Sequence, residues 1–192
     1  METNSLGLAK LQSRDPKTKY GFAKELVQIA KDDPAFLYPW FDQLTELLDS
    51  ENNILKWNAF ALADILGYLS KIDSDQQIDG ILPKLTNLLH SGHLITCNHA
   101  IFALGLTAQN KPAHQTAIIN ELLKVANDTF ETETCRAIAM GKVLETLHPF
   151  AHTIKDNTEV MQFMRDAQAS QRNATKNKAD RLLRKLEKVN NH

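Results

Sequence analysis

Two pairs of histidines have a spacing at which side chains can share a metal ion. His90 and His93 lie three residues apart across an expected helix break, and His148 and His152 lie four residues apart. A pair spaced by four needs a continuous helix to place both imidazoles on one face, and Pro149 interrupts that helix. Neither pair has an obvious third ligand. We therefore expect solvent-exposed loop histidines and predict no metal site.

Motifs for nucleophilic catalysis and phosphate binding are missing from the sequence. There is no Gly-x-Ser-x-Gly segment, no glycine-rich phosphate-binding loop and no Gly-x-Gly-x-x-Gly segment. Cys97 and Cys135 fall within apolar helical patterns, and no neighbouring base can be identified for either thiol. Acidic residues are plentiful, but their spacing singles out no pair of carboxylates for glycosidic chemistry. We therefore predict that the protein is not an enzyme and has no cofactor.

The composition excludes several broad classes of protein. The 192 residues are 43% hydrophobic and 23% charged, with a formal net charge of −1, which is typical of a globular chain. This charge predicts no strong whole-chain attraction to nucleic acid. The first residues are polar, and no stretch approaches the roughly 18 apolar residues of a membrane-spanning helix. We therefore expect a cytoplasmic protein with no membrane span.

The C-terminal segment differs in charge from the rest of the chain. From residue 171 onward, seven lysines and arginines oppose only Asp180 and Glu187, so this segment carries +5 and residues 1–170 carry −6. The basic residues are Arg172, Lys176, Lys178, Arg181, Arg184, Lys185 and Lys188. Leucines at helical spacing predict an amphipathic basic helix. This helix could cap the end of the fold, contact nucleic-acid phosphates, or bind a membrane surface or an acidic partner.

A helical period of apolar residues recurs along most of the chain, and strand-like alternation is absent. Proline, glycine and aspartate separate the helical segments at regular intervals, as in Asp15-Pro16, Asp33-Pro34 and Ser91-Gly92. The pattern predicts seven or eight helices, near residues 17–31, 35–49, 53–71, 75–90, 94–109, 112–127, 132–148 and 157–188, with the last one broken near Ser170.

These helices repeat in pairs. The segments that start at Lys56, Thr96 and Thr134 align without gaps at offsets of 40 and 38 residues. One aligned position, Ala63, Ala103 and Gly141, is always small, as expected where stacked helices approach closely. The two cysteines share another aligned position and should lie on helices about 8 to 10 Å apart, beyond the roughly 7 Å that a disulfide permits. We therefore predict two reduced, buried cysteines.

Two segments resemble the helices of a HEAT repeat, namely residues 81–89 (ILPKLTNLL) and residues 135–139 (CRAIA). The resemblance to the HEAT/armadillo superfamily covers about three repeats, at residues 35–150. It implies an all-α fold, a right-handed α–α superhelix that forms one short solenoid domain over residues 1–192. In this interpretation, residues 17–34 form an N-terminal capping helix and residues 151–192 a basic C-terminal capping helix.

The resemblance implies that the second helices of the repeats line a concave surface that binds an unidentified partner protein. Exposed candidate residues on these helices are Lys56, Asp64, His99, Lys142 and Glu145. His99 replaces an alanine in the repeat and could instead be a partly buried, hydrogen-bonded side chain. The aligned residues Asn58, Asn98 and Arg136 could bind a ligand, but we favour hydrogen bonds to the preceding inter-helix turns.

Two groups of HEAT-like enzymes provide alternatives. HEAT-like hydroxylases hold two irons through repeated His-Glu dipeptides, and this sequence contains no such dipeptide. DNA-alkylation-repeat glycosylases act on DNA through a basic concave face, whereas the repeat region here is acidic overall. The sequence therefore favours a non-catalytic interaction scaffold. The alternative is a nucleic-acid-associated protein that uses the basic C-terminal helix.

Overall fold

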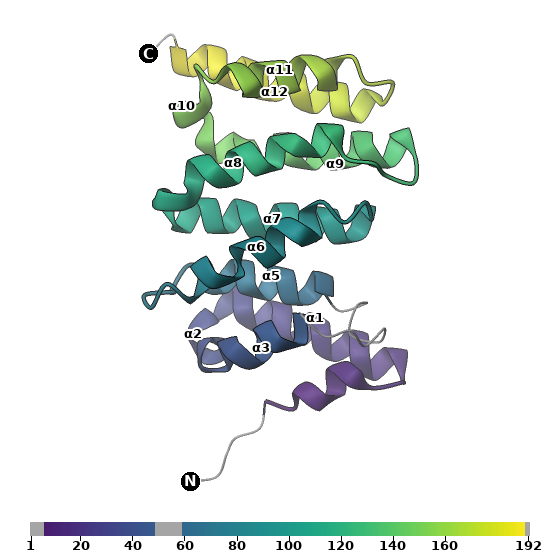
Figure 1. Ribbon diagram of the computed structural model, residues 1–192, viewed down its shortest axis with the longest axis vertical. Helices are drawn as coiled ribbons and strands as arrows, with labels where there is room; N and C mark the ends of the chain where they lie inside the picture. Colours follow the sequence, from purple (N-terminus) through teal and green to yellow (C-terminus); the bar gives the residue numbers. More distant parts are fainter. Residues whose placement is uncertain (1–5, 49–58, 191–192) are drawn as a thin grey trace.

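The computed structural model describes residues 6–48 and 59–190, and this part of the chain is helical and contains no strand (Figure 1). Short 3₁₀ helices, labelled η, connect or extend several α-helices. The elements in chain order are η1 (Leu8–Gln12), α1 (Pro16–Asp32), α2 (Pro34–Leu37), η2 (Tyr38–Trp40), α3 (Phe41–Leu48), α5 (Ala59–Leu69), α6 (Gln77–Leu89), α7 (Leu94–Asn110), η3 (Pro112–His114), α8 (Gln115–Lys124), η4 (Val125–Asn127), α9 (Glu133–Leu147), η5 (His148–Phe150), α10 (Ala151–Ile154), α11 (Thr158–Gln168) and α12 (Asn173–Asn190).

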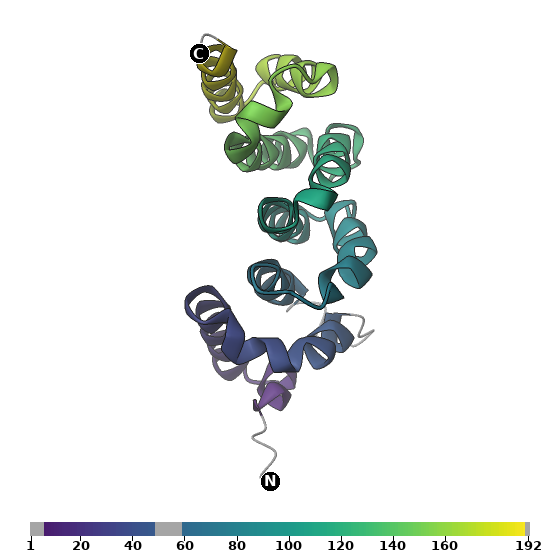
Figure 2. The same ribbon diagram turned by 90° about the vertical axis from the view of Figure 1, so that its left-hand side faces the viewer.

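The longer helices form two layers, which Figure 2 shows end-on. Helices α1, α5, α7, α9 and α12 form one layer, in which each helix packs against the next. Helices α3, α6, α8 and α11 form the other. The stack is curved, because α1 and α12, the two terminal helices of the first layer, are displaced toward its concave side. We call the first layer the inner layer and the second the outer layer.

Local sequence signals explain where the helices begin. The Asp15 carboxylate accepts hydrogen bonds from the backbone amides of Thr18 at 2.9 Å and Lys17 at 3.4 Å. Asn157 caps α11 in the same way, and the Thr132 hydroxyl accepts from the backbone amide of Cys135. These caps satisfy amides that lack a partner within the helix.

Two expected helix boundaries differ from the structure. The segment 35–49 is not one helix, because Pro39 lacks the amide needed to continue it and the chain passes through η2 between α2 and α3. Residues 151–190 contain the short helix α10 followed by a hairpin of α11 and α12, rather than a single capping helix. The break near Ser170 is confirmed, because α11 ends at Gln168 and α12 begins at Asn173.

Small residues allow close packing within the inner layer. Ala63 and Ala103, at equivalent repeat positions, are fully buried. Gly141, at the third equivalent position, lies against Thr175 and Lys178 of α12. Cys97 is buried, as predicted, whereas the prediction of a buried Cys135 is wrong: this residue is only partly buried because it lies in the first turn of α9. Both thiols are free. Within the described residues, no helix is long and apolar enough to cross a membrane.

Candidate functional site

A contact between a histidine and a carboxylate joins two neighbouring helices at the centre of the inner layer. Nδ1 of His99 on α7 lies 2.9 Å from both carboxylate oxygens of Asp64 on α5. The imidazole also stacks on Phe60, with ring centroids 5.0 Å apart. Because the carboxylate favours a proton on Nδ1, the neutral ring presents Nε2 as a hydrogen-bond acceptor, and protonation converts Nε2 into a donor.

Aromatic and basic side chains lie beside this pair. The Tyr68 and Phe102 rings make an edge-on contact, with centroids 5.5 Å apart. Nζ of Lys142 on α9 lies 6.0 Å from the centroid of Phe102, at the outer range of a cation–π contact. Burial raises the pKa of Tyr68, and the negative charges of Asp64 and Asp32 raise it further. The Tyr68 hydroxyl therefore remains a hydrogen-bond donor at neutral pH.

Two adjoining hollows flank the Asp64–His99 pair. The first hollow, between α1, α5 and α7, has a volume of about 670 Å³. Its lining consists of Tyr20, Ala23, Lys24, Val27, Gln28, Phe60, Ala61, Asp64 and His99. The second hollow, of about 340 Å³, is lined by Asp64, Tyr68, Asn98, His99, Phe102 and Lys142. The first hollow is mainly apolar and the second is a mixture of polar and apolar surface, which is a combination suited to a ligand with both kinds of group.

Asn98 gives the second hollow an unusual polar group. Its Oδ1 atom is buried and has no hydrogen-bond partner within the part of the chain that the structure describes. A buried acceptor without a partner is costly, and because this atom is buried a ligand could bond to it only after neighbouring side chains move.

The structure brings three of the five predicted inner-surface residues together. Asp64, His99 and Lys142 line the same hollow. Glu145 lies further along α9 and forms an ion pair with Lys178 of α12, at 3.0 Å. Lys56 lies outside the described residues. Tyr20, Lys24 and Gln28 escaped the sequence prediction because α1 was expected to be only a cap.

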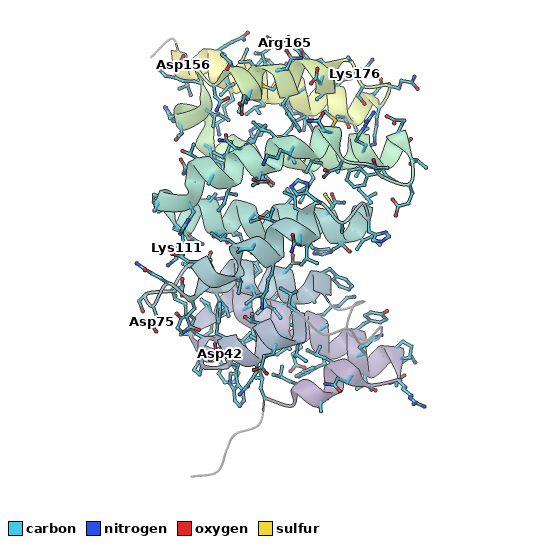
Figure 3. The ribbon with its side chains drawn as sticks, in the orientation of Figure 1. Asp42, Asp75, Lys111, Asp156, Arg165 and Lys176 are labelled. Carbon is cyan, nitrogen blue, oxygen red and sulfur yellow. The ribbon has the colours of Figure 1, made fainter. Side chains whose placement is uncertain are left out.

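The basic C-terminal residues are distributed around α12. Leu182 and Leu186 are buried against the fold, while Arg181, Arg184, Lys185 and Lys188 are exposed. Arg172, Lys176 and Lys178 are half-buried. Figure 3 shows Lys176 on α12 and Arg165 on α11 at the C-terminal end of the stack. Leu182 and Leu186 therefore cover apolar surface at the end of the stack, as expected of a capping helix.

The expectation of exposed loop histidines is wrong for two of the four. His90 is half-buried, with Nδ1 2.8 Å from the Asp128 carboxylate, because the turn after α6 packs against the following hairpin. His148 is also half-buried, and burial lowers its pKa, with a further lowering from the positive charge of Lys185. His93 and His152 are exposed, as expected. Within the described residues, no group of three potential ligands could hold a metal ion.

The aligned polar residues behave differently from the prediction of bonds to inter-helix turns. Arg136 forms an ion pair with Glu133, one turn earlier in its own helix. The turn at Asp128 is instead bound by His90. Asn58 lies outside the described residues.

No known family model matches the chain, and a comparison with curated proteins finds no significant match. We therefore infer function from the geometry of the inner-layer side chains.

Proposed function

We propose that this protein is a non-catalytic binding scaffold, a short right-handed HEAT/armadillo-like solenoid that holds a partner protein on its inner layer. The observation that carries this proposal is the pair of adjoining hollows around Asp64 and His99. Together they offer aromatic surface, an imidazole, a carboxylate and lysine ammonium groups on four neighbouring helices, α1, α5, α7 and α9.

The rigidity of the surface supports binding without large rearrangement. The floor of the first hollow is formed by Ala23 and Ala61, which are 2% and 3% exposed, so it belongs to the packed core. The Asp64–His99 hydrogen bond and the Tyr68–Phe102 contact hold the polar and aromatic side chains in place. A preformed surface of this kind loses little conformational entropy on binding.

The chemistry of the surface favours a peptide-like partner over a reaction. The second hollow holds Lys142 as a cation and the Phe102 ring as an apolar wall. Carboxylates and apolar side chains of a protein segment would match these two groups. Among the described residues that line the hollows, no serine, threonine or cysteine is available as a nucleophile.

The second candidate is a nucleic-acid-associated protein, and the exposed cations of α12 favour it. Arg181 and Lys185 lie near enough to His148 to lower its pKa, so they form a local basic cluster. Such a cluster would release counterions on binding phosphates. We favour capping of the stack as the main role of α12, because Leu182 and Leu186 of this helix are buried.

Capture of partners from native lysate with matched variants tests the proposal. Gln28 lies exposed at the first hollow, and Gln28→Trp should cover the hollow without disturbing the core. Gln43→Trp, at an exposed position of α3 in the outer layer, introduces the same side chain away from the site. We expect Gln28→Trp to weaken capture about tenfold or more and Gln43→Trp to leave it unchanged. Equal capture by both variants would refute the assignment of the inner layer.

A further inference from the structure

Histidines join two consecutive hairpins of the stack at both ends of their helices. His114, just before α8, places Nε2 2.9 Å from Oδ1 of Asp79 in the first turn of α6, which is an ion-pair distance when the imidazole is protonated, although the two groups are not aligned for a hydrogen bond. At the other end, His90 contacts Asp128 and Glu121, and His93 contacts Glu131 at 3.1 Å. We call this contact between the α6–α7 hairpin and the α8–α9 hairpin the histidine junction.

His90 contacts a carboxylate with each of its two ring nitrogens. Its Nδ1 lies 2.8 and 3.0 Å from the two carboxylate oxygens of Asp128, and its Nε2 lies 3.4 Å from Glu121. A neutral imidazole carries only one N–H group, so one of these nitrogens would direct a lone pair at a carboxylate. The imidazolium form donates from both nitrogens and satisfies both contacts. The His90, Asp128 and Glu121 side chains are 26%, 17% and 33% exposed, so water screens the contacts only in part.

The other charged groups at the histidine junction are mostly negative. Lys124 forms an ion pair with Glu121 at 2.7 Å, and a hydrogen bond from Lys124 is the largest cause that lowers the pKa of Glu121, with His90 adding to it. Burial and the charge of Asp128 raise the pKa of the neighbouring Cys97 thiol to about 12, so this thiol stays neutral.

The charge balance of the junction therefore depends on its histidines. Four carboxylates face it, from Asp79, Glu121, Asp128 and Glu131, and Lys124 and three histidines oppose them. The junction carries −3 with neutral histidines and no net charge when all three are protonated. Histidine is the side chain that ordinarily changes charge between pH 5 and pH 8.

The contact between α9 and α12, further along the stack, is built differently. Among the described residues, the Lys178–Glu145 ion pair and the hydrogen bond from the Thr175 hydroxyl to the Ala137 carbonyl oxygen join these two helices without a histidine. His148, which follows α9, is half-buried and faces Lys185 and Arg181 of α12 rather than a cluster of carboxylates, so burial and these charges lower its pKa. A response of His148 to pH is therefore separate from that of the histidine junction.

We propose that the histidine junction is a proton-dependent clamp, which tightens the contact between the α6–α7 and α8–α9 hairpins as the solution becomes mildly acidic. The clamp also affects the inner layer, because it joins the hairpin that carries Phe102 on α7 to the hairpin that carries Lys142 on α9. Loosening the junction at higher pH gives α9 more freedom relative to α7.

Hydrogen exchange on the full chain tests the clamp. The wild type, His90→Gln and the control His152→Gln are compared at pH 5.5 and pH 7.5, with protection factors corrected for the intrinsic exchange rate. His152 is exposed and serves as a matched substitution. For amides of the α6–α7 turn and of residues 121–131, we expect His90→Gln to reduce protection about twofold to fivefold at pH 5.5 and little at pH 7.5. The control should change protection at neither pH.

The proposal is refuted if His90→Gln reduces protection equally at both pH values, because His90 then acts only as a neutral hydrogen-bonding group. If His90→Gln lowers protection throughout the chain, Glu121→Gln provides the second test, since it removes one acidic partner and leaves His90 in place. We then expect a weaker pH response at the junction, and an unchanged response overturns the proposal.

Discussion

Gly67 on α5 lies so close to Ala103 on α7 that a Cβ atom at residue 67 would be 2.8 Å from the Ala103 Cα atom. No side chain fits at this distance, so the backbones of these two inner-layer helices touch directly. The repeat alignment predicts Ala103 as a small position. Gly67 is its packing partner on the preceding hairpin.

Gly67→Ala tests this contact. We expect the variant to lower the free energy of unfolding by about 1 to 3 kcal/mol, because α5 and α7 must separate to admit the methyl group. Gly21→Ala on α1 is the control, since its Cβ would meet nothing within 4 Å. In the control, the free energy of unfolding should rise by up to about 1 kcal/mol, because alanine has a higher helix propensity than glycine. Urea unfolding measures both variants. Equal stabilisation of both variants would contradict the close approach.

Asp73 organises the turn between α5 and α6. Its carboxylate accepts from the Tyr38 hydroxyl at 2.7 Å and from Lys111 Nζ at 2.8 Å, as well as from the amides of Gln77 and Ile78. Figure 3 shows Lys111 at the edge of the stack beside Asp75 of this turn. Burial alone would raise the pKa of Asp73, but these hydrogen bonds outweigh burial and hold it below its ordinary value.

The lowered pKa of Asp73 predicts a defined response to acid. A carboxyl group with a lower pKa in the folded state stabilises the fold above its unfolded pKa, and this stabilisation is lost as the pH falls through the folded value. We expect the melting temperature of the wild type to decrease as the pH falls below about 4. In Asp73→Asn, this decrease of melting temperature with pH should be smaller. Asp73→Asn should also lower the free energy of unfolding by about 1 to 3 kcal/mol at pH 7. An unchanged acid slope in the variant would contradict this role.

The half-buried His148 predicts a loss of stability in mild acid. Burial and the charges of Lys185 and Arg181 lower its pKa, so the folded state favours the neutral ring. Stability is then lost as the pH falls through the unfolded value near 6.5. His148→Gln should therefore reduce the loss of melting temperature between pH 7.5 and pH 5.5, while His152→Gln should not. A greater loss in His148→Gln would show that the charged ring is the stabilising form.

The basic C-terminal helix distinguishes a cap from a nucleic-acid site. We expect deletion of residues 171–192 to lower the melting temperature, because Leu182 and Leu186 are buried and their removal exposes α9 and α11. We expect fluorescence anisotropy to detect no tight binding of duplex DNA at about 50 mM salt. Tight binding that falls steeply by about 200 mM salt, and that is lost in Arg181→Glu, would instead support the nucleic-acid function.

The all-helical class and most helix positions were predictable from the sequence, because apolar periodicity and caps depend on residues close together in the chain. The contacts between hairpins were not. His90 and Asp128, His93 and Glu131, and Thr175 and Ala137 are each 38 residues apart, the spacing of the repeat. The repeat offset gives this spacing, but it does not say which side chains meet across it. His90 therefore looked like a loop residue.

The candidate site was predictable only in part. Asp64, His99 and Lys142 follow from the expectation that second helices line the inner side. Tyr20 and Gln28 do not, because the packing of α1 against α5 depends on side chains distant in the sequence. Pro39 is a local signal that should have divided the segment 35–49, since proline disrupts a helix interior.

Photo-crosslinking in native lysate tests the central claim most directly. A benzoyl-phenylalanine side chain is placed at residue 28, beside the first hollow, or at residue 43 on the outer layer, and crosslinked proteins are identified by mass spectrometry. We predict a discrete crosslinked partner from residue 28 and none from residue 43. A partner captured from residue 43 and not from residue 28 would contradict the binding function assigned to the inner layer.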